Sequence, residues 1–135
     1  MLFFLDCNCP TVTLSLSGSA NAELPFLAGN YQEDVMINGH QSWNNTDYAI
    51  WFSDVSNDWV VGRVGKRGTN HRWIEANNQG SKCPYDITAD WYLYYSSQWN
   101  LAAGAFFTCS QPKSKKTKPM RILEVYTVPN NSYRF

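Results

Sequence analysis

The sequence predicts an all-β fold, arranged as a single compact antiparallel β-sandwich or small barrel built from hairpins. Apolar positions alternate or form short blocks, and no long stretch shows the 3.6-residue period of an amphipathic helix. Val, Ile, Thr, Tyr, Phe and Trp dominate these positions, as is typical of strands. Turn residues recur at short spacing between the blocks, as they do between the strands of a sandwich or barrel.

We expect strands over residues 11–17, 30–37, 47–53, 59–64, 71–76, 90–96, 99–108 and 120–128. Asn38-Gly39 is the strongest hairpin signal, because both residues tolerate the positive φ that a type I′ turn requires. The residues from Asp54 to Asp58 form a further turn, for which ordinary turn chemistry is favoured over a calcium site. The apolar start, Met1 to Leu5, is too short for the core of a signal peptide and is expected to be a first strand or to pack on the core.

A chain of 135 residues has room for one compact domain. We expect a β domain over residues 1–111, a basic loop over 112–119, and a C-terminal strand and tail over 120–135 that belong to the same domain. The 16% aromatic content excludes a disordered chain. No apolar run approaches the roughly 20 residues that a membrane-spanning helix needs.

The net charge of zero hides an asymmetry between the two ends of the chain. Residues 1–111 contain five Lys and Arg against ten Asp and Glu, whereas residues 112–135 contain six against one. The basic segment is expected to be a solvated loop, with a contact for an anionic partner or an arm folded onto the acidic body as alternatives. Its lysines are Lys113, Lys115, Lys116 and Lys118. They are not interleaved with aromatic residues, which argues against nucleic acid as the partner.

The cysteines of the chain indicate the cellular compartment in which the protein is found. There are four of them: Cys7, Cys9, Cys83 and Cys109. Their even number in a loop-rich chain favours disulfides, and with them an extracellular or cell-surface location over a cytosolic or virion one. Cys7 and Cys9 are too close in sequence to bridge each other easily, but the pairing stays open. Reduced thiols are one alternative. A zinc site is another, although the spacing is not a usual zinc pattern, and we expect no metal and no cofactor.

Two segments repeat one hairpin pattern, in which an aromatic strand ends at Ser and the return strand opens with Trp. Residues 48–53 precede Trp59, and residues 91–96 precede Trp99. Aromatic residues occupy both faces of these strands, so one face forms the core and the other is either covered by a second layer or displayed. A displayed row of Trp and Tyr is typical of a binding surface. The candidates are Trp43, Trp51, Trp59, Trp73, Tyr94 and Trp99.

Several short motifs occur in one order: Gly29-x-Tyr31, Asn38-Gly39 with Trp43 four residues later, Tyr48-x-Ile50-Trp51-Phe52, and Trp59-x-x-Gly62. This order resembles a small Trp/Tyr/Gly-rich β module that recurs in proteins of marine invertebrates, algae and other protists. Gln41 stands where that module often has Pro. The resemblance implies a β module, often in secreted or surface proteins, and favours binding over catalysis. It supplies no catalytic residues to transfer.

Motifs that carry catalysis are few. His40 and His71 lack a metal-ligand spacing and are expected to be a solvated turn residue and a residue at the start of a strand. We therefore expect a non-enzymatic, lectin-like binding or adhesion module whose aromatic surface meets a carbohydrate or protein partner. The alternative is a structural subunit of a virion or multiprotein complex that docks, or oligomerises, through the basic segment and the C-terminus. A small hydrolase built on a pair of carboxylates is a third hypothesis.

Overall fold

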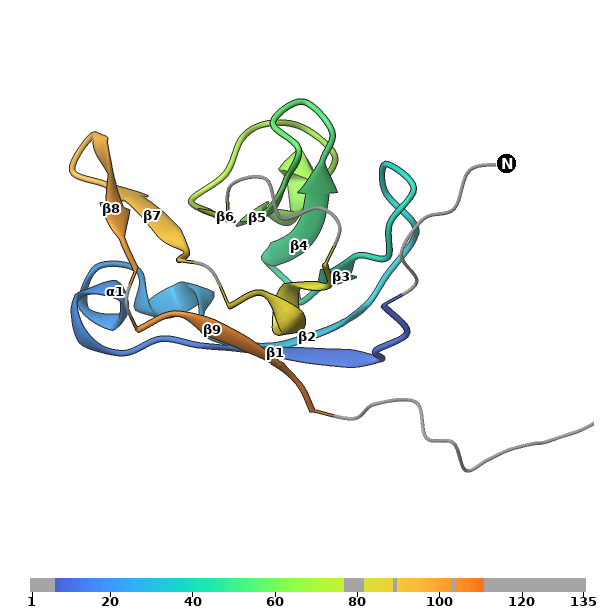
Figure 1. Ribbon diagram of the computed structural model, residues 1–135, viewed down its shortest axis with the longest axis horizontal. Coiled ribbons are helices and arrows are strands. Elements are labelled where there is room, and N and C mark those ends of the chain that lie inside the picture. The colour runs from blue at the N-terminus through green and yellow to red at the C-terminus, as the bar shows by residue number, and fades with distance from the viewer. Residues whose placement is uncertain (1–6, 77–81, 89, 103, 111–135) are drawn as a thin grey trace, which may run out of the picture.

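The computed structural model describes residues 7–76, 82–88, 90–102 and 104–110 (Figure 1). These residues form nine strands, one short α-helix and three 3₁₀ turns. In chain order the elements are β1 (Thr11–Ser15), α1 (Gly18–Glu23), η1 (Pro25–Leu27), β2 (Gly29–Glu33), β3 (Trp43–Asn44), β4 (Tyr48–Ser53), β5 (Asp58–Arg63), η2 (Val64–Lys66), β6 (Ile74–Ala76), η3 (Pro84–Asp86), β7 (Tyr92–Tyr95), β8 (Gln98–Leu101) and β9 (Phe106–Cys109).

The described strands form one antiparallel sheet in the order β8-β7-β6-β5-β4-β3-β2-β1-β9. The all-β prediction is confirmed, and the sheet curls into a half-barrel instead of stacking as two layers. Consecutive strands are neighbours up to β8, and β9 then crosses to pair with β1 at the far edge. The curl brings the two ends of the sheet together, since the Trp91 and Phe107 rings lie 4.4 Å apart.

Several predicted strands are shorter than expected, for local reasons. The first ends at Ser15, because the chain turns at Gly18, whose φ is +61°, into α1. The expected strand over residues 99–108 is divided into β8 and β9 by a turn in which Ala105 N–H donates to Ala102 O. Strand 30–37 stops at Glu33, and β3 has no counterpart among the predicted strands. Strand 120–128 and the basic loop lie outside the described residues.

The predicted hairpins are present. Ile37 pairs with His40 around Asn38-Gly39, whose φ angles of 53° and 81° match the positive values that the sequence predicts. The repeated pattern produces the β4–β5 and β7–β8 hairpins. In both, the Trp that opens the return strand lies opposite an aromatic residue, Trp59 opposite Phe52 and Trp99 opposite Tyr94.

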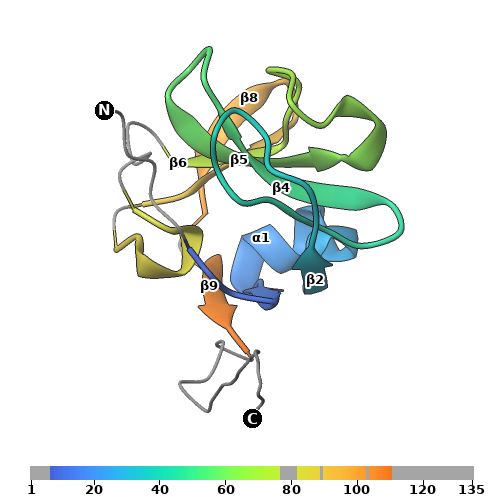
Figure 2. The same cartoon turned by 90° about the vertical axis from the view of Figure 1, so that its right-hand side faces the viewer.

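The main core lies inside the curl of the sheet. α1, seen near β9 and β2 in Figure 2, contributes Ala20 to the same cluster as the strands, and η1 contributes Leu27. Tyr31 is fully buried there and donates a hydrogen bond from Oη to Leu27 O at 2.5 Å. The largest fully buried side chains of this cluster are Trp43, Trp59, Tyr31, Leu14, Leu27, Ile50, Ile74, Leu93, Val12 and Val61.

A second, smaller cluster covers the opposite face of β4 and β5. It contains Ala49, Trp51 and Val60, and the segment after β5 packs over it. Trp51 Nε1 donates to Thr69 O of that segment at 3.0 Å. A Cβ at Gly62 would lie 2.7 Å from His71 O, so this close approach requires glycine. The first aromatic hairpin is therefore packed on both faces.

Two disulfides tie the N-terminal segment to the rest of the fold, Cys7 to Cys83 and Cys9 to Cys109. The disulfide prediction is confirmed, and the structure selects one of the pairings that the sequence leaves open. The second bond anchors the chain before β1 to the end of β9. Among the described residues, no helix has the length and apolar character needed to cross a membrane.

Candidate aromatic binding site

Three of the six predicted surface aromatics are not on the surface, and for them the prediction is wrong. Trp43, Trp51 and Trp59 have no exposed area. Each indole N–H donates to a backbone carbonyl, from Trp43 to Cys9 at 2.6 Å, from Trp51 to Thr69 at 3.0 Å and from Trp59 to Lys82 at 2.6 Å. A Trp can be buried without cost to its polar atom when that atom finds such a partner. These rings hold the fold together and cannot meet a ligand.

The other three lie together around a hollow of about 300 Å³. Tyr94 is 39% exposed and Trp99 is 38% exposed, with their rings edge to face at 5.3 Å, whereas Trp73 is partly buried. We call this feature the aromatic hollow. Its lining residues are Asn70, His71, Arg72, Trp73, Tyr94 and Trp99.

The length of each turn explains why Trp59 is buried and Trp99 is exposed. Ser53 pairs with Asp58 in the first hairpin and Tyr95 pairs with Gln98 in the second. Trp59 therefore lies opposite the residue before Ser53, whereas Trp99 lies opposite the second residue before Ser96. Ile74 lies opposite Leu93, and both are fully buried in the main core. Because side chains alternate between faces, Tyr94 and its partner Trp99 point away from that core. In the first hairpin, Phe52 and Trp59 point into it. The two hairpins therefore differ by one residue in the register of the return strand, and this difference places the two Trp side chains on opposite faces of the sheet.

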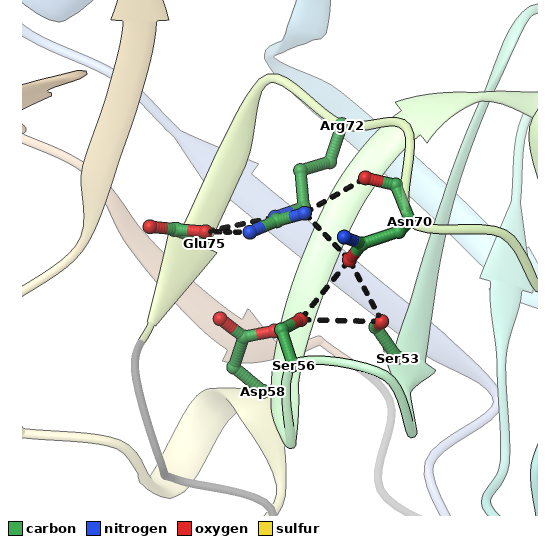
Figure 3. Close-up of polar contacts among 6 residues, drawn as sticks. All are labelled: Ser53, Ser56, Asp58, Asn70, Arg72 and Glu75. Atoms are coloured by element: carbon green, nitrogen blue, oxygen red, sulfur yellow. Dashed lines mark hydrogen bonds and ion pairs between the residues drawn. The ribbon is translucent and has the colours of Figure 1, made fainter.

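Arg72 forms the polar wall of the aromatic hollow and is held in place by four hydrogen bonds (Figure 3). Its Nε and Nη2 donate to Glu75 Oε1 at 2.8 and 2.5 Å. Its Nη1 donates to Asn70 O at 2.7 Å and to Asn70 Oδ1 at 2.6 Å. The guanidinium carbon lies 5.5 Å from the centre of the Trp99 ring. This cation–π contact supports one side of the Trp99 ring.

The hydrogen bonds continue from Asn70 into the β4–β5 loop. Ser53 Oγ donates to Asn70 Oδ1 at 3.1 Å, and Ser56 Oγ donates to Asp58 Oδ1 at 2.5 Å. Burial raises the pKa of Asp58, while the Ser56 hydrogen bond and the positive charge of Arg72 act in the opposite direction. The loop that the sequence predicts as a turn therefore helps to fix the wall of the hollow.

Trp73 also belongs to a second group of aromatic rings. Phe26, which is 46% exposed, lies 5.7 Å from Trp73 and 5.4 Å from Tyr48. The guanidinium carbon of Arg63 lies 5.1 Å from the centre of the Trp73 ring. We call Phe26, Tyr48 and Trp73 the Phe26 cluster. Trp73 belongs both to this cluster and to the aromatic hollow, so the two features share one ring.

The expected role of His40 in a solvated turn is wrong. His40 is only 7% exposed, because its ring stacks on Phe52 at 4.2 Å and meets Trp59 edge to face at 5.6 Å. His71, expected at the start of a strand, instead lies exposed in the loop before β6, where it lines the aromatic hollow. No group of three His, Cys, Asp or Glu able to hold a metal ion occurs in the part of the chain that the structure describes.

Sequence reasoning missed the polar wall formed by Asn70 and Arg72, as well as Phe26 and Arg63. One signal was available, since four of the five Lys and Arg residues in positions 1–111 lie between Arg63 and Arg72. The candidate partner-binding lysines, Lys113, Lys115, Lys116 and Lys118, lie outside the described residues.

Comparison with known proteins identifies no relative. No family model matches the chain, and neither does a curated protein or a solved structure. The resemblance to a Trp/Tyr/Gly-rich β module stays a prediction.

Proposed function

We propose that this protein is a non-enzymatic binding module that holds a saccharide ring against Tyr94 and Trp99 in the aromatic hollow. The observation that carries the proposal is the placement of two large exposed rings beside a hydrogen-bonded polar wall. A sugar offers both an apolar C–H face and a rim of hydroxyl groups. Aromatic side chains suit the first, and the polar atoms of Asn70 and His71 suit the second.

The rigidity of the site supports binding. Trp99 is contacted by Tyr94 from one direction and by the fixed guanidinium of Arg72 from another. A ligand that meets rings already held in place does not lose affinity to the ordering of those side chains. An isolated exposed apolar residue needs no functional explanation, but a supported pair at the edge of a hollow is a feature of binding sites.

The size of the site favours a saccharide over a protein partner. The volume of about 300 Å³ is at the lower end of the range for small-molecule sites, roughly 300–1,000 Å³. A stable protein interface buries about 800 Å² on each partner, which is more than one such hollow provides. The two disulfides are consistent with a secreted or cell-surface protein, where saccharides are abundant ligands.

A glycan array followed by isothermal titration calorimetry tests the proposal. We expect Trp99→Ala to weaken saccharide binding about tenfold or more, which corresponds to about 1.4 kcal/mol. Phe106→Ala is the matched control, because Phe106 is 55% exposed on β9 but does not line the aromatic hollow. The proposal is wrong if no saccharide binds, or if both variants bind as tightly as the wild type.

A further inference from the structure

Positive charge is concentrated beside the aromatic surface of an otherwise acidic body. Residues 63–72 contain four of the five Lys and Arg residues of positions 1–111 and none of the ten Asp and Glu residues. We call this stretch the cationic segment. It runs from the end of β5 to the wall of the aromatic hollow. Its positive residues are Arg63, Lys66, Arg67 and Arg72.

Two of these four charges are neutralised by carboxylates of the protein. Arg67 forms an ion pair with Asp34, and Arg72 forms one with Glu75. Within the described part of the chain, neither Arg63 nor Lys66 forms an ion pair. The cationic segment therefore keeps a net positive charge after its internal pairs are formed.

Arg63 contacts Trp73, one of the rings that line the aromatic hollow. Its side chain is exposed, and its guanidinium lies over Trp73, the ring that the hollow shares with the Phe26 cluster. The contact with Trp73 orients the guanidinium but uses none of its N–H donors in a hydrogen bond. A planar guanidinium oriented in this way suits bidentate contact with a carboxylate or sulfate group.

Arg72 is not available for the same task. Hydrogen bonds to Glu75 and Asn70 use four of the five N–H donors of its guanidinium, and its charge is paired with Glu75. The hollow itself therefore suits an uncharged ring, whereas the surface next to it, at Arg63, suits an anionic group. The hollow and the surface at Arg63 are adjacent, because Trp73 lines the hollow and also contacts the Arg63 guanidinium.

We infer that the ligand is an acidic saccharide, one ring of which stacks in the aromatic hollow while a carboxylate or sulfate group binds Arg63. The inference rests on the proposed function and adds the chemical class of the ligand. Lys66, three residues after Arg63 and exposed, adds to the positive potential. Exposed charges of this kind act through a field that salt screens, so the binding of an acidic sugar should depend on ionic strength.

The test compares hexagalacturonate with its methyl ester, which keeps the sugar rings and removes the charges. A heparin hexasaccharide provides the sulfated arm, and hexaglutamate provides an acidic peptide without sugar rings. Binding is measured by calorimetry to the wild type, to Arg63→Gln and to Lys82→Gln. Lys82→Gln is a matched control, because Lys82 is exposed and its substitution also removes one positive charge. Lys82 lies far from Arg63 along β5, since its backbone carbonyl accepts a hydrogen bond from Trp59 at the other end of that strand.

We expect at least one acidic saccharide to bind at least fivefold more tightly than the methyl ester and to weaken when salt is raised. Arg63→Gln should reduce that affinity about three- to tenfold, and Lys82→Gln should leave it within twofold. Equal affinity for the methyl ester and the acidic sugars, with no effect of Arg63→Gln, would overturn the inference and leave the proposed function standing. Equal binding of hexaglutamate would also overturn it. If no saccharide binds, the proposed function itself fails.

Discussion

Gly62→Ala is the substitution whose effect follows most directly from the packing of the aromatic site. A Cβ at this position would lie 2.7 Å from His71 O and 2.9 Å from Trp51 Cη2. Trp51 does not move freely, because it is fully buried and its indole N–H is bonded to Thr69 O. The added methyl group must therefore push the segment that carries His71 and Arg72 away from the sheet.

The cost has two parts. Overpacking a well-packed site costs about 1–3 kcal/mol. Loss of the Trp51–Thr69 hydrogen bond adds about 1 kcal/mol. We expect the free energy of unfolding of Gly62→Ala to fall by about 2–4 kcal/mol. Because the displaced segment carries the wall of the aromatic hollow, saccharide affinity should fall as well.

Urea denaturation followed by circular dichroism measures the change in stability. Gly65→Ala is the matched control, since Gly65 lies in the same segment, does not have a positive φ, and would place an added Cβ in open space with no neighbour within 4 Å. We expect Gly65→Ala to change stability by no more than about 0.5 kcal/mol. If Gly62→Ala lowers the free energy of unfolding no more than Gly65→Ala does, the segment after β5 does not pack against Trp51 as described.

Two further predictions concern the disulfides and the buried carboxylate. Replacing both Cys9 and Cys109 by Ala should lower the free energy of unfolding by about 2–5 kcal/mol, because the disulfide closes a long loop. A thiol assay of the denatured, unreduced wild type should find no free thiol from Cys7, Cys9, Cys83 or Cys109. Free thiols in that assay would contradict the two disulfides. Burial raises the pKa of Asp58 above its ordinary value of 3.8, so the folded state binds the proton more tightly than the unfolded chain does. The contribution of Asp58 to stability therefore falls as the pH rises from 3.8 through the raised pKa. Asp58→Asn should therefore gain stability relative to the wild type between about pH 3 and pH 7 in urea titrations, and a difference that does not change with pH would refute this.

The sequence predicts the local pairing well, because that pairing depends on neighbouring residues. Asn38-Gly39 encodes its own turn, and each aromatic hairpin brings a Trp opposite an aromatic residue. The disulfide-bonded state of the cysteines was also predictable, although their pairing was not, because the pairing depends on how the curled sheet brings β9 next to β1.

Burial of the tryptophans was not predictable, because it depends on contacts between distant strands. Trp59 and Trp99 both follow the Ser that ends an aromatic strand, but the turns differ in length, so Trp59 lies inside the curl and Trp99 outside. Which face of each hairpin is covered depends on the register across β5, β6 and β7 and on the segment that packs over Trp51. Local patterns contain neither piece of information, so half of the predicted surface residues belong to the core.

Nuclear magnetic resonance of the indole N–H groups tests the central claim most directly, because the six tryptophans act as internal controls for one another. During titration of ¹⁵N-labelled protein with the oligosaccharide that the array identifies, the Trp99 and Trp73 signals should shift. The signals of the buried Trp43, Trp51, Trp59 and Trp91 should stay in place. Saturable binding that leaves the Trp99 signal unmoved would contradict the account.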